Sequence, residues 1–232
     1  MTTSSITSES SGHESTGLES SRSALSAAST VRVEVEIATL GTEAYAPREL
    51  IPLFHELIRE QALDDLLIDV ADYSHVPEGP GLVLVGHDAV ISYRDRLGGP
   101  AGRRSLLYSR RRESWRPVEP ATPASRLRAA LCNTLAAGRV LEQRLGERMR
   151  WDTRSFEVTL NDRLSAPHGD ATRLTWRSEI EGLAAATYPD ARARIVVRGE
   201  DSRERLGFLV EGSVWVEPVE AILGRIAPGE ES

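Results

Sequence analysis

The sequence is short of several residue types, and each shortage excludes a class of protein. It contains no lysine, so all 28 basic residues are arginine. Its only cysteine is Cys132, which excludes an intramolecular disulfide or a cysteine-based zinc site and fits a reducing compartment. No apolar run approaches the roughly 20 residues of a membrane-spanning helix, and the N-terminus lacks the pattern of an export signal. These shortages predict a soluble, cytoplasmic protein.

The usual sequence signatures of enzymes are missing as well. There is no glycine-rich phosphate loop, no Gly-x-Ser-x-Gly elbow, no His-Glu-x-x-His helix and no kinase signature. A formal net charge of −7 disfavours sequence-independent binding to nucleic acid, which needs a positive surface. We therefore expect no cofactor, no metal and no membrane association, and the net charge disfavours a nucleic-acid partner.

Composition and periodicity divide the chain into five segments. Residues 1–30 contain 16 Ser or Thr and no aromatic residue, which predicts a disordered tail. Residues 31–116 form an N-terminal α/β half, 117–150 a linker and a long helix, 151–216 a C-terminal α/β half, and 217–232 an acidic tail that frays.

Hydrophobic periodicity predicts the main elements. Val31 to Ile37 alternates apolar and charged residues, which is typical of a half-buried strand. Apolar residues from Leu50 to Ile58 recur at helical spacing. Thr122 and Pro123 are an N-cap and a first helical residue, and the apolar stripe of the helix that follows suits packing on a sheet or on another subunit.

The last third of the chain echoes the first. Phe156 to Leu160 alternates like the first strand, a helix follows, and Arg194 to Val197 returns as a strand. The sequence therefore predicts an α/β or α+β fold: two diverged βαβ-type halves, each with a small twisted mixed sheet, joined by a long central helix. This internal duplication rests on short matches.

The densest group of chemically capable side chains lies between Leu66 and Asp88, where two apolar strands flank a Gly-Pro-Gly turn. The candidate catalytic residues are His87 with Asp88, and His75 with Asp72 or Asp69. If the strands form an antiparallel hairpin with Tyr73 opposite Leu82, His75 and His87 lie about 17 Å apart, too far for one metal ion.

Arginines gather between Arg94 and Arg116, where they could hold phosphate, carboxylate or an acidic partner. The candidate anion-binding residues are Arg103, Arg104, Arg110, Arg111 and Arg112. A solvated hairpin is the alternative interpretation.

These features favour a non-catalytic protein that binds a protein partner, itself or an acidic ligand through the helix stripe, a sheet edge or the tail. The alternative is a small-molecule enzyme using a His/Asp site within residues 69–88. A histidine facing a concave polar pocket would favour the enzyme.

Overall fold

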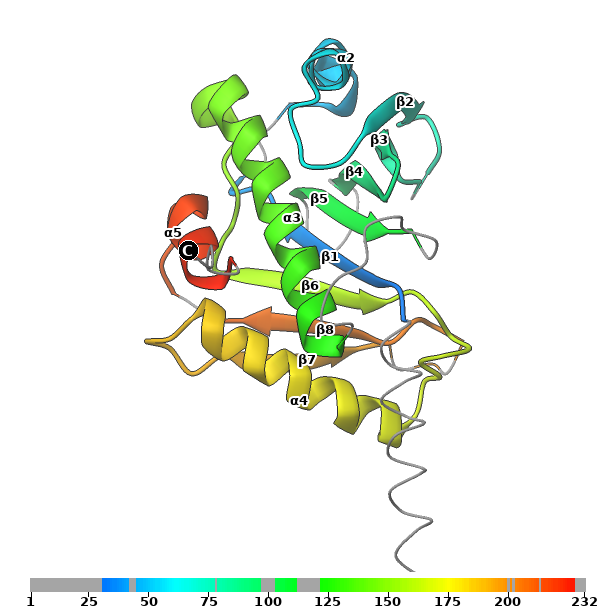
Figure 1. Cartoon of the computed structure of the whole chain (residues 1–232), viewed down its shortest axis with the longest axis vertical. Coiled ribbons are helices and arrows are strands. Elements are labelled where there is room, and N and C mark those ends of the chain that lie inside the picture. Colours follow the sequence, from blue (N-terminus) through cyan, green and yellow to red (C-terminus); the bar gives the residue numbers. More distant parts are fainter. Residues whose placement is uncertain are drawn as a thin grey trace, which may run out of the picture.

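The fold is seen in a computed structural model, which describes residues 31–41, 45–77, 79–96, 103–111, 122–199, 201, 203–212 and 214–227. The expected tail of residues 1–30 lies outside the described residues. Within them the chain has an α+β architecture (Figure 1).

One eight-stranded sheet runs through the molecule in the order β2-β3-β4-β5-β1-β6-β8-β7, and every neighbouring pair is antiparallel. The strands are β1 (Val33–Ala38), β2 (Leu67–Tyr73), β3 (Gly81–Gly86), β4 (Ala89–Arg96), β5 (Arg103–Arg110), β6 (Ser155–Leu160), β7 (Arg194–Arg198) and β8 (Gly207–Glu211).

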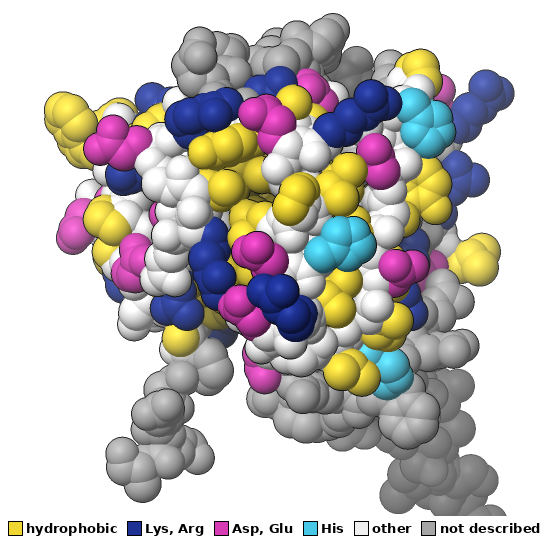
Figure 2. All heavy atoms as spheres, turned by 90° about the horizontal axis from the view of Figure 1, so that it is seen from above, with side chains coloured by type: hydrophobic (Ala, Val, Ile, Leu, Met, Phe, Trp, Pro, Cys, Tyr) yellow, Lys and Arg dark blue, Asp and Glu magenta, His cyan; other side chains and the backbone are white. Residues whose placement is uncertain are grey.

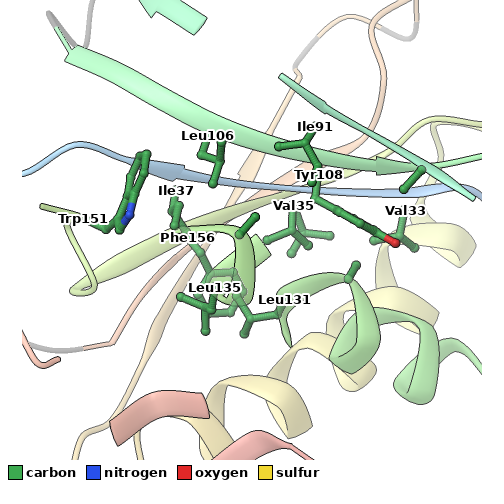
Figure 3. Close-up of a cluster of buried hydrophobic side chains, with 14 of the residues drawn as sticks. Val33, Val35, Ile37, Ile91, Leu106, Tyr108, Leu131, Leu135, Trp151 and Phe156 are labelled. Carbon is green, nitrogen blue, oxygen red and sulfur yellow. The ribbon is translucent and has the colours of Figure 1, made fainter. Parts of the chain in front are cut away.

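The two alternating strands predicted from sequence meet at the middle of this sheet. In β1 and β6, Val35 lies opposite Val158, and both side chains are fully buried. Alternation sends Val33, Val35 and Ile37 to one face of the sheet, since successive side chains of a strand point to opposite faces. Figure 3 shows the hydrophobic cluster that they form with helical residues.

The helices complete the described chain. They are the 3-10 helix η1 (Pro47–Leu50), α2 (Ile51–Glu60), α3 (Pro123–Leu145), the 3-10 helix η2 (Gly146–Arg148), α4 (Asp170–Thr187) and α5 (Val219–Ile226). Leu131 and Leu135 of α3 point towards Val35 and Ile37 (Figure 3), so α3 packs its apolar stripe on the centre of the sheet. α4 and α5 pack against α3 in turn.

The start of α3 confirms the prediction from Thr122 and Pro123. The Thr122 side chain accepts a hydrogen bond from the Ser125 backbone N–H at 3.1 Å, and Pro123 is the first helical residue. Because the leucine stripe is buried in the chain's own core, it is not available as a docking surface.

Two features of the predicted fold are wrong. There are not two small mixed sheets, because β1 and β6 pair edge to edge and merge both parts of the chain into one antiparallel sheet. The segment 217–232 is not simply a fraying acidic tail: residues 219–226 form α5, whose Val219, Ile222 and Ile226 are buried. The prediction was wrong because it relied on the acidic average composition of the segment and not on the helical spacing of its few apolar residues. The internal duplication stays a prediction.

Candidate functional site

The predicted hairpin of β2 and β3 is confirmed, with its register moved by one residue. Tyr73 lies opposite Gly81 rather than Leu82, and Leu67 lies opposite Gly86. His75 is in the turn at one end and His87 follows the other end, so about six strand residues, or roughly 20 Å, separate them. The structure does not bring the two histidines together.

At the turn, the Asp72 carboxylate contacts Ser74 and Arg48. The Asp72 carboxylate accepts a hydrogen bond from the Ser74 backbone N–H at 2.8 Å and lies 3.8 Å from the Arg48 guanidinium. Hydrogen bonding by Ser74 holds the pKa of Asp72 below its usual value. His75 is exposed to solvent. This arrangement is that of a turn whose aspartate caps the backbone.

At the other end, His87 and Asp88 are neighbours, but their closest polar atoms, Nδ1 and Oδ1, are 3.6 Å apart. This exceeds hydrogen-bond length. Asp65 organises the turn instead, because its carboxylate accepts the backbone N–H groups of Asp88 at 3.0 Å and of Ala89 at 3.0 Å. Asp69 accepts the N–H of Val70 and is exposed.

The candidate anion-binding arginines do not form one site. Arg103 and Arg104 begin β5, where Arg103 contacts Asp152 at 2.5 Å and Arg104 contacts Asp95 at 3.2 Å. Arg110 ends the same strand and Arg111 follows it, about 20 Å away. Arg112 lies outside the described residues. Sequence proximity was misleading here because an extended strand carries its ends far apart.

A cavity of about 400 Å³ lies elsewhere, between α2 and α3 above the inner face of β4 and β5. We call it the α2–α3 cavity. Its lining comes from three parts of the chain: Ala62, Leu63, Asp64 and Asp65 after α2; Asp88, Ile91, Tyr108 and Arg110 on the sheet; and Asn133, Ala136, Arg139 and Val140 on α3. A volume in this range suits a small organic molecule.

The wall after α2 is fixed by Gln61. This residue ends the helix in the left-handed conformation, with φ of 48°. Its side-chain amide then makes two hydrogen bonds to the backbone of Leu67, both at 3.0 Å. The connection of residues 62–66 is thereby held in place, and Asp64 and Asp65 are set at the cavity.

The opposite wall is built on α3, away from its leucine stripe. Asn133 Nδ2 approaches the Tyr108 hydroxyl oxygen at 3.4 Å, which joins helix and sheet across the cavity. Burial raises the pKa of Tyr108 to about 12, so its hydroxyl keeps its proton at neutral pH. At the far end, Glu60 of α2 and Arg144 of α3 form an ion pair that bridges the two helices.

Charges around the cavity are mixed. Asp64, Asp65 and Asp88 are acidic, whereas Arg110 and Arg139 are basic. Figure 2 shows the end of the molecule that carries α2, where hydrophobic side chains lie among acidic, basic and histidine side chains and neither sign of charge gathers alone. The site therefore suits a molecule with both polar and apolar parts.

Sequence reasoning singled out two residues of this lining, Asp88 and Arg110, and missed the rest. A usable signal was present in the long helix. Asn133, Ala136, Arg139 and Val140 recur at spacings of three and one residues beside the leucine stripe, where small and polar side chains leave room above a sheet. Nothing in the sequence indicated that α2 would stand apart from α3.

Comparison with protein-family models, with curated proteins and with solved structures found no match. In the part of the chain that the structure describes, no group of three or more His, Cys, Asp or Glu side chains could hold a metal ion. None of the described helices is long and apolar enough to cross a membrane.

Proposed function

We propose that this chain is a non-catalytic binding protein that holds a small molecule in the α2–α3 cavity. The observation that carries the proposal is the cavity itself, a space of about 400 Å³ with apolar walls and a few convergent polar groups. Ile91, Val140 and Leu63 supply apolar surface, while Tyr108, Asn133 and Arg139 supply hydrogen-bonding groups.

Binding is favoured over catalysis by the chemistry of the lining. Among its carboxylates, Asp65 is engaged in structure, because it holds the β3–β4 turn. No serine, cysteine or histidine is among the residues that line the cavity in the described chain. The enzyme alternative with His87 and Asp88 would need His87 to reach this space.

The test is a thermal-shift screen of a small-molecule library on the wild type and on Ala136→Trp, which fills the cavity. We expect some compounds to raise the melting temperature of the wild type and not that of the variant. Mass spectrometry of the recovered compounds should show them unchanged.

The matched control is Ala124→Trp, which adds the same side chain to an exposed position of α3 outside the cavity. It should respond to compounds as the wild type does. If Ala136→Trp binds the same compounds equally well, or if a compound is chemically converted, the proposal is wrong. Ala136→Leu is a smaller filling substitution for use if the tryptophan variant does not fold.

A second candidate is self-association through β2, because this edge strand and the residue before it expose large hydrophobic side chains. Leu66, Ile68 and Tyr73 are 58%, 52% and 45% exposed. Such an edge is a template for pairing with another strand. Sedimentation of the wild type should then show a concentration-dependent dimer that Ile68→Lys abolishes, and a monomer at all concentrations would rule this candidate out.

A further inference from the structure

We infer that the ligand of the α2–α3 cavity carries an anionic group, a carboxylate, sulfonate or phosphate, which Arg139 binds, and an apolar body that lies over Ile91 and Val140. This inference rests on the proposed function and names the chemical class of the ligand. Among the described arginines of α3, Arg139 is the one that lines the cavity.

Arg139 is half-buried, and its Nε is shielded from solvent without a hydrogen-bond partner. Within the described chain its guanidinium makes no hydrogen bond or ion pair. By contrast, Arg144, Arg148 and Arg150 contact Glu60, Glu49 and Glu142 respectively. A guanidinium stays charged at any physiological pH, and a partly desolvated charge is costly unless it is paired. An anion in the cavity would supply the missing partner.

The acidic residues of the lining do not supply that partner. The Asp65 carboxylate accepts the backbone N–H groups of Asp88 and Ala89 in the turn, and the Asp88 carboxylate lies 3.6 Å from the His87 imidazole. Asp64 is exposed, so solvent screens its charge. On α3 itself, Arg139 is the one charged residue of the lining in the described chain, so this wall can receive an anion.

Tyr108 adds a second donor from the sheet, where its hydroxyl faces Asn133 of α3. Its oxygen accepts from Asn133, while the hydroxyl proton has no acceptor among the described residues. A hydroxyl and a guanidinium are both donors, and together they match the oxygens of an anionic group. Ile91 on the sheet and Ala136 and Val140 on α3 also line the cavity and suit an apolar body.

A matched pair of fluorescent probes tests the inference. 8-Anilinonaphthalene-1-sulfonate carries a sulfonate, whereas N-phenyl-1-naphthylamine has the same aromatic skeleton without it. We expect the wild type to bind one equivalent of the sulfonate probe, and to bind it about tenfold more tightly than the neutral probe. Arg139→Gln should weaken binding of the sulfonate probe by about tenfold and change binding of the neutral probe less than about twofold.

Arg128→Gln is the matched control, because Arg128 is an exposed arginine of the same helix that does not line the cavity. It should bind both probes as the wild type does. Ala136→Trp should lose both probes while its circular dichroism spectrum stays native, which places the probes in the cavity rather than on partly unfolded protein.

The outcomes distinguish a failure of the anionic ligand class from a failure of the cavity as the binding site. Equal binding of both probes, with no effect of Arg139→Gln, would overturn the anionic class of ligand and leave the cavity as the binding site. Binding that survives in Ala136→Trp, or the absence of binding by either probe, would overturn both the inference and the proposed function.

Discussion

The layer of helices is closed over one half of the sheet and open over the other. Over β6 and β8, α4 and α5 pack on α3 through buried side chains such as Trp176, Ile180 and Ile222. Over β4 and β5, α2 and α3 leave a cavity of about 400 Å³. The same sheet face thus carries helices that pack on one another over β6 and β8 and helices that stand apart over β4 and β5.

The difference follows from the side chains that each helix presents. The closed half is held by apolar contacts and by short hydrogen bonds such as that from the Tyr188 hydroxyl to the Thr153 carbonyl, at 3.0 Å. The helices of the open half are joined by a solvent-accessible ion pair, Glu60 with Arg144. Apolar burial stabilises far more than an exposed ion pair, so the closed half should carry the stability and leave the open half free for binding.

The largest expected effect is on the closed half, from Gly212→Ala. A Cβ at Gly212 would lie 1.8 Å from a ring carbon of Tyr188, which is stacked on Phe156. We expect a loss of at least about 3 kcal/mol in the free energy of unfolding, measured by urea denaturation.

The control for this substitution is Gly182→Ala in α4, where an added Cβ has no atom within 4 Å. It should stabilise the protein by roughly 0.5–1 kcal/mol, because alanine favours a helix more than glycine does. Equal tolerance of both substitutions would show that the closed half is not tightly packed.

A smaller effect is expected at the junction of the two halves, from Asp152→Asn. Asp152 accepts hydrogen bonds from Arg103 of β5 at 2.5 Å and from Arg154 Nε at 2.7 Å, and its side chain is 4% exposed. Burial raises the pKa of Asp152, but hydrogen bonds and the charge of Arg154, with Arg103, outweigh it and lower the pKa overall. We expect the variant to lose about 2 kcal/mol at neutral pH.

The lowered pKa of Asp152 predicts how the stability difference between wild type and Asp152→Asn changes with pH. Because the pKa of Asp152 is lower in the folded than in the unfolded state, its charge stabilises the folded protein at pH values above the unfolded pKa of about 4. This stabilisation is lost as the pH falls through the pKa of the folded state. The difference in unfolding free energy between wild type and variant should therefore shrink below about pH 4. Asp190→Asn, at an exposed position, is the control, and a pH-independent difference would contradict the assigned role of the Asp152 charge.

The smallest effect is expected on the open half, from Arg144→Gln. The pair with Glu60 is accessible to solvent, so its loss should lower the melting temperature by less than about 2 °C, and added salt should remove even that difference. Arg177→Gln, which breaks the Glu181 pair on α4, should behave alike. A drop of many degrees for Arg144→Gln alone would mean that the two helices depend on this pair.

The elements of the fold were readable from the sequence because their signals are local. The alternation around Val33, Val35 and Ile37 and the cap at Thr122 both confirm this. The single sheet was not readable, since which strands pair depends on contacts between distant parts of the chain. β1 carries the same pattern whether its neighbour is β6 or a strand of its own half.

The candidate site was readable only in fragments for the same reason. Asp88 and Arg110 stand out in the sequence as chemically capable residues, and their neighbours in the sequence are His87 and Arg111. Their neighbours in the cavity are Tyr108, Asn133 and Arg139, from β5 and α3. A site assembled across helices and strands has no sequence spacing by which to recognise it.

The pairing of β1 with β6 has a consequence for how the protein is made. Asn161, just after β6, contacts Glu34 of β1 across 127 positions of sequence. A ribosome adding about 5–20 residues per second needs roughly ten seconds to supply that partner. Throughout this interval one edge of the Val-Glu-Val-Glu-Ile strand has no strand to pair with, so the nascent chain must be kept from aggregating until the middle of its sheet can close.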